Sequence, residues 1–375
     1  MNKNKIYFIS LIAAFFLGMT MLTWFKAPDD YSDSERRTLA KLPQISEKSL
    51  ADGTFMTDFE TYTLDQFPAR DMFRSIKAFA GLNIFGLKDN NDIYTVDGYT
   101  SKMEYPMHPE ILEYAGEKFK NIFDAYLADT NVKTYFAIVP DKNYYLAEKN
   151  GYLSMDYDTF FSVMQEKTSY MEFVDLRDLL CIEDYYFTDT HWKQTALLPV
   201  AQELIAKMNG EDSAGNDVNP LTWEYEEVVA TDEFKGVYVG QSALPIKPET
   251  LSYLTNEQLE ACTVFSYATG KAQPMEMYTL EEASGKDPYE VFLGGAEPLL
   301  VIENPDAATE KELVVFRDSF GSSLIPLMVE NYAKITVVDI RYMNSSVIGN
   351  FVSFDNQDVL FLYSTLVLNS STSLR

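Results

Sequence analysis

The residue types that could do chemistry centre on two histidines, His108 and His191, the only ones in the chain. A reaction that needs a histidine base near neutral pH must use one of them. His191 follows Asp189 by two positions, and in an extended segment both side chains point to the same side, so the carboxylate can reach the imidazole. Ser319 lies in a turn after an apolar run. Together these groups could catalyse acyl transfer to or from a hydroxyl, which needs a nucleophile, a base and a carboxylate that orients the base.

Each of these groups also has a simpler explanation. A serine between a strand and a helix is commonly a helix N-cap, and an Asp-x-His pair can form a loop network or half of a metal site. A metal site would lack further ligands here. His108 lies in a Met-His-Pro loop sequence, and Cys181 and Cys262 are not in a CxxC arrangement. We therefore expect no metal and no cofactor.

Other side chains near these groups could bind substrate or stabilise an oxyanion. Ser319 precedes a predicted helix, where backbone N–H groups and the helix dipole favour negative charge, and Gly321 leaves room beside the hydroxyl. Lys142 and Arg341 could bind an anionic group of the substrate, or remain solvated at strand ends. The further candidates are Trp192, Arg317, Asp318, Gly294, Gly295 and Asn304, of which Asn304 is otherwise a turn residue.

Helices and strands alternate from residue 110 onward. Apolar spacing predicts a helix over 111–128, and a buried strand follows over 132–139. A short strand is predicted near 173–176. A helix is predicted from 194 to about 208, with Pro199 near its start or at a kink.

The C-terminal part has the clearest pattern. A strand over 313–316 leads through the turn RDSFGSS to a helix that ends near residue 332, and strands over 334–340 and 358–364 follow. Near-continuous apolar strands separated by helices predict an α/β fold with a parallel sheet covered on both faces.

Such a sheet would bring three polar clusters to one edge. Ligands bind at the carboxyl ends of parallel strands. Three clusters follow predicted strands or strand-end loops: Asp141–Lys142, Asp189–Trp192 and Arg317–Ser319. The predicted fold alone therefore brings an acid, a histidine and a serine to the same end of the sheet.

The sequence FTDTHW (187–192) resembles the DxHW signature of the DHHW proteins of Gram-positive bacteria. These proteins are relatives of the SGNH-like domains of periplasmic alginate O-acetyltransferases. Further blocks resemble the family in the family's order, at 34–46, 59–73, 291–304 and 314–342. The resemblance covers most of the chain beyond its N-terminal apolar segment and is weaker over 210–285.

The resemblance implies an SGNH hydrolase-like fold in which Asp189, His191 and Ser319 form a catalytic triad. Two positions depart from the family pattern: Thr190 replaces the first histidine of DHHW, and Arg317 replaces the glycine of the usual GDS block. The implied activity is that of an extracytoplasmic O-acyltransferase or esterase, which adds or removes acetyl groups on a cell-envelope or exported glycan through a serine acyl-enzyme. A membrane-bound protein could supply the acyl group. The alternative is a catalytically degenerate, membrane-tethered glycan-binding or scaffold protein.

The N-terminus predicts a membrane anchor. Residues 6–25 carry no charge and are long enough for a helix across about 30 Å of hydrocarbon. Lys3 and Lys5 precede this segment, so the positive-inside rule predicts a single-pass protein with its C-terminal domain outside the cell. The segment ends in bulky residues without a small-residue cleavage site, which favours an anchor over a cleaved signal peptide that would leave the protein secreted.

The remaining chain is expected to divide into a juxtamembrane linker and one large domain. The anchor covers 1–26 and the polar linker 27–54. The SGNH-like domain covers 55–375 and begins with a helical stretch that Pro68 divides. Residues 210–290 are less regular and predict an insertion or lid.

Composition excludes several classes of protein. The chain has 375 residues, of which 46% are hydrophobic, which is enough for a sizeable core. Its formal net charge is −27, from 57 acidic and 30 basic residues, and it has no long basic run. We therefore expect no nucleic-acid binding. The two cysteines cannot form a disulfide scaffold, although they could pair with each other outside the cytosol.

Overall fold

The computed structural model describes residues 3–210 and 221–375. The chain divides into two compact units. The larger joins Asp92–Tyr238 to Lys247–Arg375, and the smaller joins the chain up to Asn91 to Val239–Ile246. The larger unit thus begins at Asp92, whereas the sequence predicts that the SGNH-like domain starts at residue 55.

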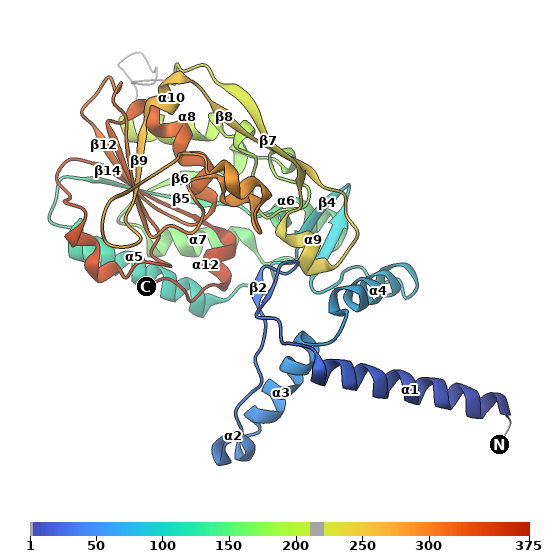
Figure 1. Ribbon diagram of the computed structural model, residues 1–375. Coiled ribbons are helices and arrows are strands. Elements are labelled where there is room, and N and C mark those ends of the chain that lie inside the picture. The colour runs from blue at the N-terminus through green and yellow to red at the C-terminus, as the bar shows by residue number, and fades with distance from the viewer. Residues whose placement is uncertain (1–2, 211–220) are drawn as a thin grey trace. The chain divides into compact units, whose positions relative to one another are not determined.

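An eight-stranded sheet forms the centre of the larger unit (Figure 1), with the strand order β10-β9-β11-β13-β12-β14-β5-β6. The five strands from β13 to β6 are parallel neighbours. They are the apolar runs that the sequence predicts as strands, and their pairing confirms the α/β class. Their bounds are Lys334–Val338 (β13), Glu312–Arg317 (β12), Asp358–Ser364 (β14), Lys133–Val139 (β5) and Glu172–Asp175 (β6).

Three antiparallel strands extend the sheet at its other edge: β11 (Leu299–Glu303), β9 (Thr263–Ser266) and β10 (Gln273–Met275). The strands β9 and β10 lie within 210–290, so this range is not simply an insertion or lid. At four and three residues they are too short to show a clear alternation of apolar and polar residues. β10 also contains Pro274, which an edge strand tolerates because one side of its backbone is unpaired.

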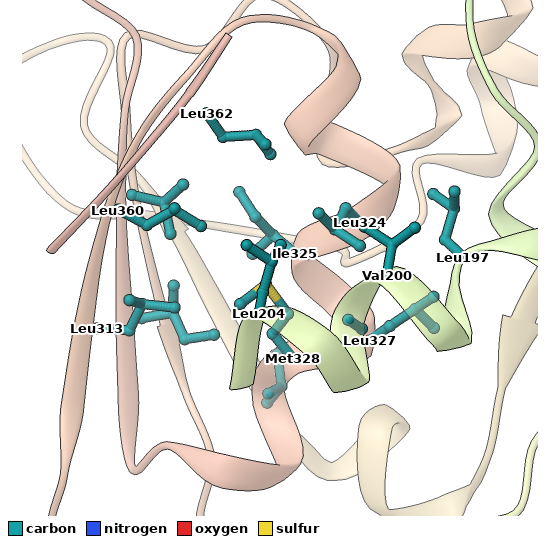
Figure 2. Close-up of a cluster of buried hydrophobic side chains, with 14 of the residues drawn as sticks. Leu197, Val200, Leu204, Leu313, Leu324, Ile325, Leu327, Met328, Leu360 and Leu362 are labelled. Atoms are coloured by element: carbon teal, nitrogen blue, oxygen red, sulfur yellow. The ribbon is translucent and has the colours of Figure 1, made fainter. Parts of the chain in front are cut away.

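Side chains that alternate along the parallel strands form the core on both faces of the sheet. On β14, Val359 and Phe361 pack toward α5 (Pro109–Tyr126) and α7 (Tyr157–Lys167). Leu360 packs on the other face. Figure 2 shows that other face, where Leu313, Leu360 and Leu362 meet Val200 and Leu204 of α8 (Leu198–Asn209) and the helical turns after Ser319.

Two prolines shape the helices near the predicted site. Pro199 lies in the first turn of α8, where no N–H is needed, and a 3₁₀ turn over Gln194–Ala196 precedes that helix. The helix predicted to end near 332 is a short α11 (Phe320–Leu324) followed by a 3₁₀ segment over Ile325–Asn331. Pro326 lacks the N–H that a continued α-helix would use.

Shorter elements complete the larger unit. They are β3 (Ile93–Val96), β4 (Tyr99–Lys102), α6 (Lys142–Asn150), β7 (Glu226–Phe234), β8 (Glu249–Thr255), α10 (Glu257–Ala261) and α12 (Thr365–Ser370), while α9 (Val237–Ser242) crosses the boundary between the units. β7 and β8 pair as an antiparallel ribbon.

The smaller unit contains the apolar helix α1 (Lys3–Phe25), whose side chains are mostly exposed. Among the described residues it is the one helix long and apolar enough to cross a membrane. This is consistent with a signal anchor or a signal peptide. The helical stretch with Pro68 forms α3 (Thr54–Asp65) and α4 (Arg70–Asn83), and the predicted linker contains a short hairpin, β1 (Tyr31–Ser32) and β2 (Arg37–Thr38), and α2 (Glu47–Ala51).

Candidate active site

Ser319, His191 and Asp189 form a hydrogen-bonded row at the carboxyl end of β12. Nε2 of His191 lies 2.8 Å from Oγ of Ser319, and Nδ1 lies 2.6 Å from Oδ1 of Asp189. Asp189 is fully buried, His191 is nearly so, and Ser319 is partly exposed. With the ring proton on Nδ1 and donated to Asp189, Nε2 is free to accept the hydroxyl proton of Ser319. The structure thus places a hydroxyl, an imidazole and a carboxylate in one hydrogen-bonded chain.

Asp318 holds the turn that presents Ser319. Its Oδ1 accepts the N–H of Phe320 at 3.0 Å, and its Oδ2 accepts the N–H and hydroxyl of Ser364 at 2.7 and 2.6 Å. The carboxylate is fully buried. Asp318 is a sequence candidate for substrate or oxyanion binding, but its oxygens are occupied by donors of the protein, so it shapes the turn instead.

Backbone groups that lie close to Asp189 hold its carboxylate in place. Oδ2 of Asp189 accepts the N–H of Val237 at 2.8 Å, and Oδ1 also accepts the N–H of His191 at 3.1 Å. A Cβ on Gly236 would lie 2.2 Å from the backbone nitrogen of Asp189, so only glycine fits there. Sequence reasoning missed Gly236 and Val237, because they lie in the irregular range 210–290 and no spacing links them to Asp189.

Glu249 holds the loop that carries Asp189 and His191. Its carboxylate accepts the N–H of Phe187 at 2.8 Å and both the N–H and hydroxyl of Thr188, at 2.7 and 2.5 Å. Glu249 is the first residue of β8, so the ribbon of β7 and β8 holds this loop directly. The sequence offered no signal for this contact, because glutamates are numerous in that region.

Lys142 supports the same loop from the other side. It is buried, and its Nζ donates to the backbone oxygens of Tyr186 at 3.0 Å and Phe187 at 3.3 Å. Burial lowers the pKa of Lys142 to about 7, with Asp189 and Glu249 opposing the shift. The prediction that Lys142 binds a substrate anion or stays solvated is wrong, because its ammonium group is enclosed by the protein.

The imidazole of His191 lies against two aromatic rings. The ring of Tyr289 stacks on it with centroids 3.7 Å apart and planes 5° apart, and Phe320 lies at 4.8 Å and 54°. The Tyr289 hydroxyl lies 2.7 Å from Oγ of Ser323. Burial raises the pKa of Tyr289 well above its ordinary value, so the hydroxyl stays neutral. Sequence reasoning missed Tyr289, one of 25 tyrosines.

Trp192, the residue after His191, forms hydrogen bonds with the turn that follows Ser319. Its Nε1 donates to the backbone oxygen of Phe320 and to Oγ of Ser323, both at 3.0 Å, and the side chain is fully buried. The predicted role in substrate binding is therefore wrong, since the indole has no exposed surface. Both acceptors belong to α11, so the indole joins the segment of His191 to that helix.

The sequence matches no protein-family model and no curated protein. Solved structures do match it. A DHHW family protein from Eubacterium siraeum DSM 15702 is 21% identical, with a TM-score of 0.59 over 76% of this chain and 94% of that one. This chain has the fold of that DHHW family protein.

Bacillus cereus PatB1 also has a fold similar to that of this chain. Its structure with a sulfonyl adduct gives a TM-score of 0.58 at 20% identity, over 75% of this chain and 97% of PatB1. A second PatB1 structure gives 0.56 at 17% identity. The O-acetyltransferase domain of Pseudomonas putida AlgJ is more distant, with a TM-score of 0.44 and 12% identity, and supports no argument. The TM-scores of the DHHW family protein and of PatB1 show that this chain has a fold in common with them.

Within the DHHW fold, the two predicted arginines share one buried carboxylate. Nη1 of Arg317 lies 3.3 Å from Oδ2 of Asp339, and Nε of Arg341 donates to Oδ1 of Asp339 at 2.9 Å. Arg317 also donates to the backbone oxygen of Gly295 at 3.0 Å, and burial lowers its pKa. Arg317 is fully enclosed, so its predicted role at the oxyanion is wrong. Arg341 keeps a small exposed fraction but is committed to Asp339.

The predicted glycines act through backbone geometry. Gly294 and Gly295 have φ of +65° and +69°, in the left-handed region that favours glycine. A Cβ on Gly321 would lie 2.8 Å from Cβ of Arg317, so this glycine lets α11 pack closely on β12. None of the described contacts joins these glycines to the hydroxyl of Ser319.

Asn304 lies at the amino ends of the parallel strands, whereas Ser319 follows the carboxyl end of β12. It is therefore too far along the strands to be an oxyanion donor. It follows β11, which is antiparallel to β13, and the preceding Glu303 pairs with Lys334 at the start of β13. Its side chain donates to the backbone oxygen of Val329 at 3.1 Å and accepts the N–H of Asp306. Asn304 is therefore a turn residue at the amino ends of the parallel strands.

The other side chains that the sequence analysis considered as metal ligands are His108, Cys181 and Cys262. His108 is the N-cap of α5, and its ring lies 3.3 Å from Glu110. Cys181 and Cys262 are both free thiols. Within 3–210 and 221–375, no three histidine, cysteine or acidic side chains are grouped so that they could hold a metal ion.

Proposed function

We propose that this chain is an SGNH-like O-acyltransferase or esterase that forms an acyl-enzyme on Ser319. The observation that supports the proposal is the contact of His191 with Ser319 on one nitrogen and with Asp189 on the other, at 2.8 and 2.6 Å. A serine that only capped a helix would not need a buried histidine against its hydroxyl, and the Ser319 side chain makes no capping bond to α11.

The first half-reaction acylates the enzyme. Oγ of Ser319 attacks the carbonyl carbon of an ester donor while Nε2 of His191 takes the hydroxyl proton. Asp189 remains ionised and stabilises the imidazolium through Nδ1. The tetrahedral intermediate collapses, His191 returns the proton to the departing alkoxide, and the acyl group stays on Ser319.

The second half-reaction decides between transferase and esterase. His191 removes a proton from a glycan hydroxyl or from water, and the resulting nucleophile attacks the acyl carbonyl. Ser319 leaves and recovers its proton from His191. A glycan acceptor gives an O-acylated polymer, whereas water releases the free acid.

The proposed acceptor is a cell-envelope or exported glycan, and the proposed acyl source is a membrane-bound donor protein. The apolar α1 supports a site held outside the cell, because Lys3 and Lys5 precede the span. The net charge of −27 disfavours nucleic acids as partners.

A sulfonyl fluoride tests the proposed nucleophile. PatB1 has been solved with a sulfonyl adduct, and phenylmethylsulfonyl fluoride modifies activated serines. We expect one sulfonyl group on the peptide that contains Ser319, and none in Ser319→Ala or His191→Ala. Ser322→Ala is the matched control and should react like the wild type. An unmodified wild type would instead support a degenerate glycan-binding scaffold.

A further inference from the structure

Helix α4 of the smaller unit carries an apolar face that the described residues leave exposed. Met72, Ile76 and Phe79 recur at helical spacing and so lie on one side of the helix. Ile84 and Phe85 follow directly after the helix end. The exposed fractions of these five side chains range from 53% to 76%. Several exposed apolar side chains on one side of a helix indicate an interaction site.

The opposite side of α4 is the one that packs within the unit. Ala78 on that side is fully buried. Arg74, one turn earlier, donates to the backbone oxygens of Gly240 and Gln241 at 2.9 and 3.1 Å. Glu35 lies 3.1 Å from Arg74 as well. These contacts hold α4 in one orientation, so Met72, Ile76 and Phe79 face away from the unit.

Hydrogen bonds place the start of α4 near the end of α1. Asp29 follows α1 by four residues, and its N–H and C=O bond the side-chain amide of Gln66, each at 2.9 Å. Gln66 in turn precedes the first residue of α4 by four positions. Four residues span at most about 14 Å, so both helix ends are tied to the same point.

Two further contacts support this arrangement. Nη1 of Arg70, the first residue of α4, lies 2.5 Å from Glu35, in the turn between β1 and β2. Phe73 of α4 also lies against Phe15 of α1, with ring centroids 6.5 Å apart. The apolar face therefore belongs to an element fixed next to the apolar helix.

We propose that α4 and residues 84–85 lie in the outer interface of the lipid bilayer that α1 spans, with Met72, Ile76 and Phe79 in the acyl boundary. A helix with one apolar face and a charged opposite face is suited to lie in the membrane plane. The occupant is a lipid surface because the span and α4 belong to one unit and are pinned together. This inference does not depend on the proposed activity of Ser319.

Cysteine labelling of the full chain in vesicles tests the proposal. Cys181→Ser and Cys262→Ser remove the native thiols, and Ile76→Cys introduces one site for an environment-sensitive nitrobenzoxadiazole label. Asp71→Cys is the matched control, because Asp71 is exposed on the same helix outside the apolar face. The proteins are reconstituted in vesicles of phosphatidylglycerol and phosphatidylethanolamine.

The label at position 76 is expected to emit at shorter wavelength and to be quenched by nitroxide lipids at a depth of about 5–10 Å. It should resist aqueous iodide, while the label at position 71 should be quenched by iodide and not by lipid. Equal iodide quenching at both positions overturns the proposal. A shielded label that nitroxide lipids do not quench also overturns it, because a second protein surface would then cover the face. Phe79→Cys repeats the measurement if Ile76→Cys fails to fold.

Discussion

Replacing Tyr289 separates the two contacts that this side chain makes beside His191. Tyr289→Phe removes only the hydroxyl, which lies 2.7 Å from Oγ of Ser323. Tyr289→Leu also removes the ring that stacks on the imidazole at 3.7 Å. A neutral buried hydrogen bond contributes about 0.5–1.5 kcal/mol. We expect Tyr289→Phe to lower the free energy of unfolding by about that amount and to leave kcat/KM near the wild-type value.

In the proposed mechanism, the ring of Tyr289 lowers the barrier of the reaction. His191 becomes an imidazolium when it takes the proton of Ser319, and an aromatic face beside a cation stabilises it by about 0.5–2 kcal/mol. That charge exists in the transition state and not in the ground state, so loss of the ring raises the barrier by the same amount. We therefore expect Tyr289→Leu to lower kcat/KM by about 2- to 30-fold.

Hydrolysis of p-nitrophenyl acetate by both variants, measured beside urea unfolding, checks this reasoning. The decisive comparison is leucine against phenylalanine, since both remove the hydroxyl. A leucine variant as active as the phenylalanine variant would refute a role for the stacked ring. Equal losses in both variants would assign the effect to the hydroxyl instead.

Three further predictions concern Asp189 and two residues that hold its loop in place. Asp189→Asn should lower kcat by about 10⁴-fold with the fold intact, because a neutral amide neither fixes the required imidazole tautomer nor stabilises the imidazolium; circular dichroism and ester hydrolysis test this. Gly236→Ala should lower the free energy of unfolding by about 1–3 kcal/mol, since its Cβ would lie 2.2 Å from the backbone of Asp189; a wild-type melting curve would contradict it. Burial lowers the pKa of Lys142 from 10.5 to about 7. Between these two pH values the folded state therefore binds fewer protons than the unfolded state. Stability should then rise with pH, by up to about 1.4 kcal/mol per unit, and urea unfolding of Lys142→Met should lack this part of the slope.

Local patterns are sufficient to predict the elements that position Ser319 and His191. Four of the five parallel strands are largely apolar runs, which a sheet buried on both faces requires, whereas the edge strand β6 reads EFVD. The Asp-x-His spacing and the turn at Ser319 are short-range features, and strand ends of one sheet must meet at one edge. The amino-acid sequence alone therefore predicts that Asp189, His191 and Ser319 lie together.

Contacts between distant segments could not be predicted in this way. Gly236, Glu249 and Tyr289 reach the site from the region of least periodicity, and each is one of many residues of its type. Lys142 and Arg317 follow or end apolar strands, where the sequence predicts charges open to solvent or substrate, yet both are enclosed. Burial of a charge depends on partners such as Asp339, which no spacing along the chain reveals.

A mass spectrum of the protein after incubation with p-nitrophenyl acetate tests the acyl-enzyme most directly. The proposed mechanism predicts one acetyl group on Ser319 and none in Ser319→Ala or His191→Ala, with turnover in Ser319→Ala lowered about 10³-fold or more. An unacetylated Ser319 in the wild type, together with equal hydrolysis by all three proteins, would contradict it.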